Sequence, residues 1–147
     1  ESDVGRDADR DDLINAVATV APAFEINEQR LKPEATPQQR LEDNLSQWGI
    51  VVGEGRRLDW SAFPFDSLSV DLTRDREHVE TVAAKNHIDD HFDSLVALAA
   101  TLARFDRVIK AGDQVITGSY TRQRIVRSGC WCGNFGAAIG RVEVEFS

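Results

Sequence analysis

The sequence has few cysteines, no long apolar run and no excess of positive charge, and each of these shortages argues against a class of protein. Two cysteines in 147 residues are too few for the disulfide framework of a small secreted domain. No apolar run approaches the length of a membrane span, and the first residues are acidic rather than signal-like. A net charge of −8 lacks the basic surface that nucleic acids and anionic membranes require. We therefore expect no nucleic-acid or membrane partner.

The length and composition are those of one soluble globular domain. With 147 residues, of which 41% are hydrophobic, the chain can bury about two-thirds of its unfolded surface. No linker or internal repeat interrupts residues 1–147, so we predict a single domain. The Cys130-Trp131-Cys132 spacing places both thiols on one face of a strand, where a mutual disulfide would be strained. We interpret them as reduced thiols, which predicts a cytoplasmic protein.

Apolar residues at helical spacing predict three helices. The first contains Leu13, Val17 and Val20 and is stopped by Pro22. The second begins at Thr36-Pro37 and stops at Gly49, and the third is capped by Asp89 or Asp90. The predicted apolar face of the second helix is Leu41, Leu45 and Trp48, and that of the third is Phe92, Leu95, Leu98, Leu102 and Phe105.

Short apolar or alternating segments predict strands between and after these helices. Residues 141–146 alternate most clearly, and Arg74-Asp75-Arg76-Glu77 predicts a turn between two strands. Because helices and strands follow one another without a regular βαβ pattern, the order predicts an α+β fold with a mostly antiparallel sheet. The predicted strands lie near residues 21–26, 50–52, 68–72, 79–82, 114–117 and 141–146.

A single carboxylate, Glu25, lies in the otherwise apolar run Ala21–Ile26. A buried ionised carboxylate costs several kcal/mol or more unless a cation, hydrogen-bond donors or a proton compensates it. If Phe24 and Ile26 face inward on a strand, Glu25 faces the opposite way, because side chains alternate. Glu25 therefore lies either on a solvent-exposed face or in a site.

Two further segments carry polar side chains suited to chemistry. His87 and His91 flank the predicted start of the third helix, where a histidine can move protons near neutral pH; the alternative is helix capping and surface polarity. Thr117-Gly118-Ser119 ends a predicted strand, where hydroxyls and backbone N–H groups can hold a carboxylate or an oxo group. An ordinary turn is the alternative there. Lys32 is a loop cation that matters only if its loop folds over a pocket.

These segments, taken in order, resemble the motifs of 2-keto-4-pentenoate hydratases and the related 2-oxo acid decarboxylases of the fumarylacetoacetate hydrolase superfamily. The resemblance extends from about residue 13 to the end of the chain. It is carried by Ala21–Ile26, Asp43–Ser46, Gly49–Gly53, Ala111–Ser119, Phe135-Gly136 and Gly140–Phe146.

The resemblance implies a mixed, mostly antiparallel β-roll of the fumarylacetoacetate hydrolase C-terminal type, with flanking helices. It also implies Mg²⁺ or Mn²⁺ held by three carboxylates, of which Glu25 matches the third. In that family the metal chelates a small 2-oxo acid and stabilises its enolate as a Lewis acid. Ser46, Thr117 and Ser119 match positions near the substrate. His87, His91 and Lys32 are then the candidates for the general base.

One departure from the family pattern concerns the other two metal ligands. The family places them in a Glu-x-Glu pair upstream of the Glu25 motif, whereas Glu1-Ser2-Asp3 lies too close to Glu25 to match. We therefore expect either that the pair and its preceding region are missing or that the chain is a fragment or a reduced form. The predicted function is a metal-dependent hydratase that adds water to a 2-hydroxy-dienoic or 2-oxo-enoic acid. The alternatives are a decarboxylase, an acylpyruvate hydrolase, or a non-catalytic subunit, with a homo-oligomer or a partner enzyme expected.

Overall fold

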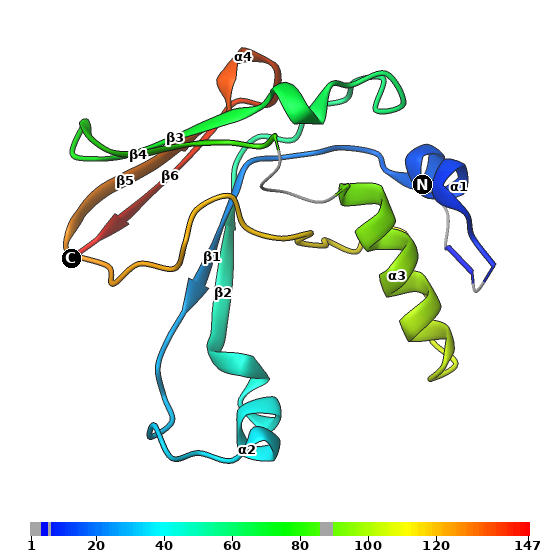
Figure 1. The fold of residues 1–147 in the computed structure, drawn as a ribbon, viewed down its shortest axis with the longest axis horizontal. Helices are drawn as coiled ribbons and strands as arrows, with labels where there is room; N and C mark the ends of the chain where they lie inside the picture. Colours follow the sequence, from blue (N-terminus) through cyan, green and yellow to red (C-terminus); the bar gives the residue numbers. More distant parts are fainter. Residues whose placement is uncertain (1–3, 6, 86–89) are drawn as a thin grey trace.

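A four-stranded antiparallel sheet forms the body of the molecule (Figure 1). The computed structural model describes residues 4–5, 7–85 and 90–147. Val70 and Leu72 in the sheet are only 3% and 4% exposed, because alternate side chains of their strand point inward together. The strands predicted near 68–72, 79–82 and 141–146 are confirmed. In the spatial order β4-β3-β5-β6, the sheet contains β3 (Ser69–Arg74), β4 (Glu77–Ala83), β5 (Gly129–Asn134) and β6 (Arg141–Phe146).

The turn between β3 and β4 follows from two residues in left-handed conformations. Asp75 and Arg76 have φ angles of 50° and 69°, and the flanking Arg74 and Glu77 pair across the ladder. Two central residues with positive φ make a hairpin turn whose twist matches that of the strands. The predicted turn at 74–77 is therefore confirmed.

A second, two-stranded ladder projects from the body (Figure 1). It pairs β1 (Ala23–Asn27) with β2 (Gln47–Val52) in antiparallel register, and we call residues 23–52 the arm. The arm is attached to the body through Phe24, whose ring lies 3.3 Å from where a Cβ on Gly133 would be. A side chain at that position of β5 would make a tight contact with the ring and require it to shift.

The far end of the arm differs from its prediction. The helix α2 (Pro37–Glu42) begins at the predicted Thr36 cap, whose hydroxyl accepts a hydrogen bond from the Gln39 backbone N–H. It ends at Glu42 rather than near Gly49, because Asn44–Ser46 (η1) turn the chain through left-handed φ angles of 53°, 53° and 70°. The predicted helical face therefore does not form, and its members Leu41, Leu45 and Trp48 are 66%, 66% and 68% exposed.

Two further helices pack against each other beside the sheet. The helix α1 (Arg10–Ala16) is capped by Asp9 and buries Leu13, which is 2% exposed. It ends before Val17, contrary to the prediction, since β-branched residues favour extended backbone and Val20 instead bridges to Arg56. The helix α3 (His91–Ala103) is capped by Asp90, as predicted.

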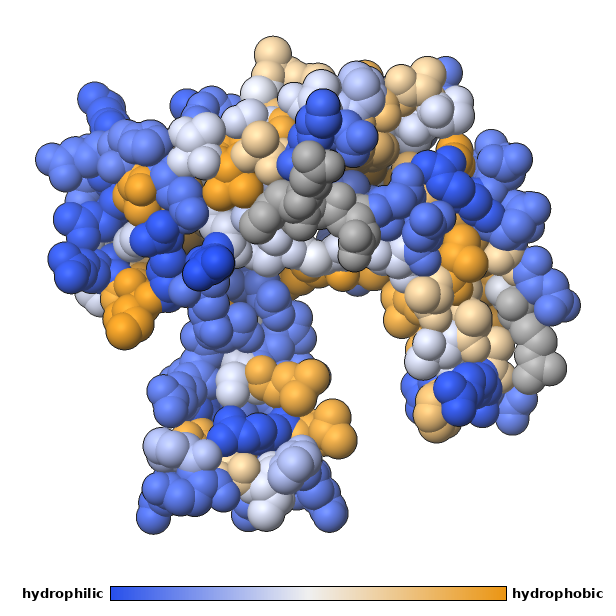
Figure 2. All heavy atoms as spheres, viewed as in Figure 1, coloured by the Kyte–Doolittle hydropathy of each residue, from blue (hydrophilic) through white to orange (hydrophobic). Residues whose placement is uncertain are grey.

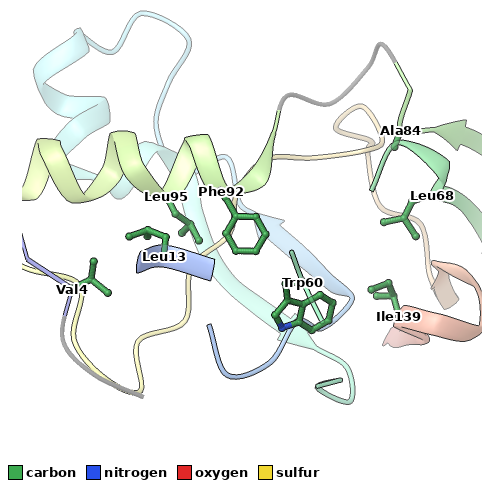
Figure 3. Packing of buried hydrophobic residues seen from close by; sticks show 8 residues of the cluster. All are labelled: Val4, Leu13, Trp60, Leu68, Ala84, Phe92, Leu95 and Ile139. Carbon is green, nitrogen blue, oxygen red and sulfur yellow. The ribbon is translucent and has the colours of Figure 1, made fainter. Parts of the chain in front are cut away.

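The hydrophobic core joins α1 and α3 to the sheet (Figure 3). Phe92 and Leu95 from the predicted face of α3 are buried, whereas Phe105 lies beyond the end of the helix and is 69% exposed. Trp60, Phe63 and Phe65 add an aromatic cluster whose ring centroids are 4.8–6.3 Å apart. Two short helices, η2 (Phe65–Ser67) and α4 (Gly136–Ile139), complete the fold. No helix within the described ranges is long and apolar enough to cross a membrane.

The strand predicted at residues 114–117 is wrong. This segment has no ladder partner, and Val115 and Ile116 are 39% and 38% exposed. Gly112 and Gly118 flank it with φ angles of 90° and 122°, so the chain turns at both ends of the segment. The segment instead runs as an irregular loop past the start of α3.

Candidate functional site

The start of α3 brings two of the predicted site residues together. Asp90 caps the helix by accepting hydrogen bonds from the backbone N–H groups of Phe92 and Asp93, at 2.8 and 3.1 Å. Its carboxylate also pairs with Arg10 of α1, at 2.7 Å. Burial alone would raise the pKa of Asp90, but these hydrogen bonds lower it below its usual range. The cap therefore remains ionised and fixes the position of His91, the first residue of the helix.

Both ring nitrogens of His91 bind hydroxyl groups of the 117–120 loop. Nδ1 lies 2.7 Å from Thr117 Oγ1, and Nε2 lies 3.0 Å from the Tyr120 hydroxyl. A neutral imidazole has one donor and one acceptor nitrogen, so one hydroxyl donates to the ring and the other accepts from it. The irregular loop and the helix are thereby joined through a single side chain.

The electrostatic environment keeps this cluster neutral. Burial lowers the pKa of His91, and the nearby charge of Asp90 only partly offsets the effect. Burial also raises the pKa of Tyr120. Near neutral pH the site therefore holds a neutral imidazole between two protonated hydroxyls, which is an arrangement that can orient a proton donor.

Aromatic rings cover the cluster on two sides. The ring of His91 lies edge-on to Phe65 with a centroid distance of 5.2 Å, and Tyr120 lies edge-on to Phe135 at 5.4 Å. These rings belong to segments far apart in the sequence, and their packing accounts for the burial of the imidazole.

A cavity of about 420 Å³ borders one of these rings, that of Phe135. It opens between the start of β3 and α4, and Phe135 lines it as well as touching Tyr120. Its polar lining includes Ser67, Ser69, Asp71 and Asn134. Among the residues that the structure describes, none of those predicted from the sequence to form a site lines this cavity.

The other predicted substrate and general-base residues that the structure describes do not join His91 and Thr117. The Ser119 hydroxyl donates to the Thr121 carbonyl at 2.7 Å, within its own loop. Ser46 lies in η1 near the far end of the arm, where its carbonyl accepts from the Glu28 backbone N–H. Lys32 is exposed in the loop before α2. Figure 1 shows that this end of the arm lies away from the start of α3. His87 falls outside the described residues.

Glu25 lies on the exposed side of β1, directly opposite Ile50 of β2. The structure thus realises the solvent-exposed alternative for this side chain, since Phe24 on the opposite face packs toward Gly133. Within the described part of the chain, no group of three or more His, Cys, Asp or Glu side chains could hold a metal ion. Whether Glu25 binds a metal stays a prediction.

Tyr120 is the member of the cluster that the sequence analysis missed. It is the only tyrosine of the chain and follows the Thr117-Gly118-Ser119 motif directly. The only available signal was this proximity, because a lone aromatic residue in a loop does not indicate a partner. Its link to His91 spans 29 residues and depends on the tertiary fold.

Comparison with known proteins identifies the fold. No family model matches the chain. Two solved structures of 4-oxalocrotonate decarboxylase from Pseudomonas putida G7 match it, with TM-scores of 0.80 for the complex with calcium and acetate and 0.81 for that with magnesium and adipate. Each is 23% identical in sequence. The match covers 100% of this chain and 56% of each neighbour, so the chain spans about half the length of these proteins.

The chain therefore has an α+β fold of the fumarylacetoacetate hydrolase C-terminal type, with mostly antiparallel strands and flanking helices. The fold class predicted from the sequence is confirmed. Its fold matches that of 4-oxalocrotonate decarboxylase.

Proposed function

We propose that this chain takes part in the conversion of a small 2-oxo acid, as a decarboxylase or a hydratase. The supporting observation is the fold, which matches a decarboxylase solved with a divalent cation and a carboxylate over 100% of this chain. The ordered motifs around Glu25 and Thr117 point to the same chemistry. The decarboxylase alternative rests on the activity of the neighbours, and the hydratase alternative rests on the order of the sequence motifs.

The His91 cluster supplies an oriented hydroxyl for such a substrate. A 2-oxo acid presents carboxylate and oxo oxygens, which accept hydrogen bonds. If Tyr120 donates to Nε2 of His91, then Nδ1–H donates to Thr117, and the Thr117 hydroxyl proton is free to donate to the substrate. Burial favours this neutral arrangement, because it lowers the pKa of His91. In this proposal Thr117 contacts the substrate and His91 is a positioning residue.

Glu25 does not make a metal site by itself. Mg²⁺ takes six oxygen ligands in near-octahedral geometry and retains water on several positions. Because the described residues include no group of three potential ligands, they do not fit the metal on their own. This misfit favours a second candidate function, a partner subunit that retains the fold but completes a site only together with another chain.

Turnover assays test the leading proposal. With Mg²⁺ or Mn²⁺ added, we expect the chain either to consume 2-hydroxypenta-2,4-dienoate or to release carbon dioxide from a 2-oxo-enedioate. The first reaction is monitored as a loss of dienol absorbance. Water addition without carbon dioxide identifies a hydratase, and carbon dioxide release identifies a decarboxylase. Absence of both reactions in folded protein contradicts an independent enzyme.

A matched pair of hydroxyl variants tests the role of Thr117. Thr117→Val removes the hydroxyl with little change in volume, and we expect kcat/KM to fall by about 10- to 100-fold, the usual effect of losing a hydrogen bond to a charged group. Ser119→Ala is the control, since that hydroxyl donates within its own loop. Equal losses in the two variants would show that Thr117 has no special contact with the substrate.

Calorimetry separates the second candidate from the first. If the chain is a partner subunit, titration with Mg²⁺ alone gives no binding heat, and addition of a catalytic partner restores activity. Tight binding by the isolated chain, lost in Glu25→Gln, would instead favour an independent metal enzyme.

A further inference from the structure

The cavity between η2, the start of β3 and α4 has the size of a small-molecule site. Its volume of about 420 Å³ lies within the range of roughly 300–1,000 Å³ that is usual for ligand pockets. Figure 1 shows the start of β3 beside α4 at the top of the view, and Figure 2 shows pale, weakly hydrophobic surface there, over α4. Neither the His91 cluster nor Glu25 lines the cavity, so the reaction proposed above leaves it unused.

Apolar side chains form the walls of the cavity and are held in place from outside it. Phe63 packs edge-on against Phe65 and Trp60, with ring centroids 4.8 and 5.7 Å away. Phe135 packs edge-on against Tyr120 at 5.4 Å. Because these contacts fix the two rings, the walls are formed before any ligand binds. The rest of the apolar lining is Pro64, Leu68, Ala137 and Ala138.

Asp71 is the one charged residue in the described lining of the cavity. The Thr81 hydroxyl donates to its Oδ1 at 2.6 Å, and His78 Nε2 lies 3.0 Å from the same hydroxyl. Since Thr81 has a single hydroxyl proton, His78 is the donor in the second contact. These bonds hold the Asp71 carboxylate in one orientation. A carboxylate accepts several hydrogen bonds, so Asp71 can still accept from a ligand.

Two other polar side chains define the remaining sides of the cavity. The Ser67 hydroxyl donates to the Pro64 carbonyl at 2.7 Å, so its oxygen can only accept a further hydrogen bond. Asn134 Oδ1 accepts from the Gly136 backbone N–H at 3.0 Å, which ties β5 to α4. Asn134 lies directly opposite Asp71 in the β3–β5 ladder. The cavity therefore offers a carboxylate and a hydroxyl oxygen to the donor groups of a ligand.

The charge of the cavity selects the sign of its ligand. The lining residues that the structure describes include no lysine, arginine or histidine. Arg141 lies opposite Asn134 in the β5–β6 ladder, but it is paired with Glu143 at 3.6 Å and does not line the cavity. An anion such as a 2-oxo acid would therefore meet the Asp71 carboxylate without a compensating cation, whereas a cation would pair with it.

We propose that this cavity binds a small organic cation with an apolar body, whose charged nitrogen pairs with Asp71 and whose body contacts Phe63 and Phe135. An ammonium or amidinium group supplies N–H donors to the carboxylate and to the Ser67 oxygen. An aromatic or aliphatic body removes the apolar walls from water. The site is separate from the proposed 2-oxo acid reaction, and its test requires no turnover.

Titration of the 147-residue chain with the benzamidinium ion, followed by ¹H–¹⁵N NMR, tests the proposal. We expect a dissociation constant of about 1 mM, as is usual for so small a ligand, with shifts concentrated in residues 67–71 and 134–138. Benzoate has the same ring and the opposite charge, and acetamidinium has the same charge without the ring. We expect each of them to bind at least about 10-fold more weakly.

A matched pair of variants tests the role of the carboxylate. Asp71→Asn removes the charge with little change in shape, and we expect it to weaken benzamidinium binding at least about 10-fold. Asp66→Asn is the control, because it removes the same charge from an exposed side chain of the neighbouring η2 that does not line the cavity. We expect Asp66→Asn to bind benzamidinium as the unaltered chain does. The same spectra report whether each variant is folded.

Several results would overturn the proposal. Equal losses in Asp71→Asn and Asp66→Asn, or equal binding of acetamidinium, would show only a general attraction of cations to a chain with a net charge of −8. Benzoate binding as tightly as benzamidinium would contradict the role of charge. Absence of saturable binding, or shifts that lie outside residues 67–71 and 134–138, would contradict the cavity itself.

Discussion

The body of the molecule buries its apolar residues, whereas the far end of the arm exposes them. Leu13 and Phe92 in the body are each 2% exposed, while Leu41 and Trp48 in the arm are 66% and 68% exposed. Both sets were predicted to form the buried face of a helix. The difference teaches that apolar spacing predicts burial only where the fold supplies a second surface.

Polar contacts take the place of a core at the end of the arm. Arg30 donates to the Asp43 carboxylate at 2.8 Å and to the carbonyls of Asp43 and Gln47 at 2.9 and 3.2 Å. These bonds tie the loop before α2 to the turn after it. The arm is therefore shaped by local hydrogen bonds, and the body by long-range packing.

The largest expected difference between the two regions is in core truncation. Phe92→Ala should lower the free energy of unfolding by about 3–5 kcal/mol, because it leaves a cavity among α1, α3 and Phe65. Leu41→Ala in the arm should change it by no more than about 0.5 kcal/mol. Urea denaturation measures both. Comparable losses would mean that the arm has a core of its own.

The helix caps provide a smaller test of the same comparison. Asp90→Ala removes the cap of α3, and we expect a loss of about 1–2 kcal/mol in the free energy of global unfolding. Thr36→Ala removes the cap of α2, whose residues include none that is buried. It should destabilise α2 locally and leave global unfolding unchanged. Native-state hydrogen exchange distinguishes the two responses, and an Asp90→Ala effect confined to α3 would contradict the expected coupling.

The smallest expected effect is the pH dependence of stability through His91. Its pKa is lowered by burial below the ordinary value of 6.5, so the unfolded chain binds more protons than the folded one just below that pH. This contribution to stability is complete above pH 6.5 and is lost as the pH falls through that region toward the lowered pKa. His91→Gln should flatten the slope of unfolding free energy there. His78→Gln, at an exposed position of β4, is the control and should retain the slope.

The elements that could be predicted are those whose determinants are local. The closing strand 141–146 alternates, the β3–β4 turn has its own sequence signal, and Thr36 and Asp90 are side-chain caps. Each depends on residues a few positions apart. One error arose where a long-range partner decides, because residues 114–117 lack a strand to pair with. The other arose locally, because α2 ends where the backbone enters left-handed conformations that the apolar spacing did not signal.

The candidate site, too, could be predicted only in part. The sequence drew attention to His91, Thr117 and Glu25 because of their residue types and neighbours. It could not show that His91 binds Thr117 across 26 residues, or that Tyr120 completes the cluster. The family resemblance favoured an inward-facing Glu25, whereas the structure exposes this side chain; alternation along the strand fixes only that it lies opposite Phe24.

By itself, the sequence determined the α+β class, the helix caps, the closing strand and the side chains suited to chemistry. The spacing of apolar residues, capping and turn preferences all act over short distances along the chain. Only the tertiary structure decided that one apolar helix face is buried and the other exposed, that a loop rather than a strand holds Thr117 against His91, and that Glu25 faces outward. These outcomes depend on which surfaces meet, and contact between distant segments leaves no periodic signal in the sequence.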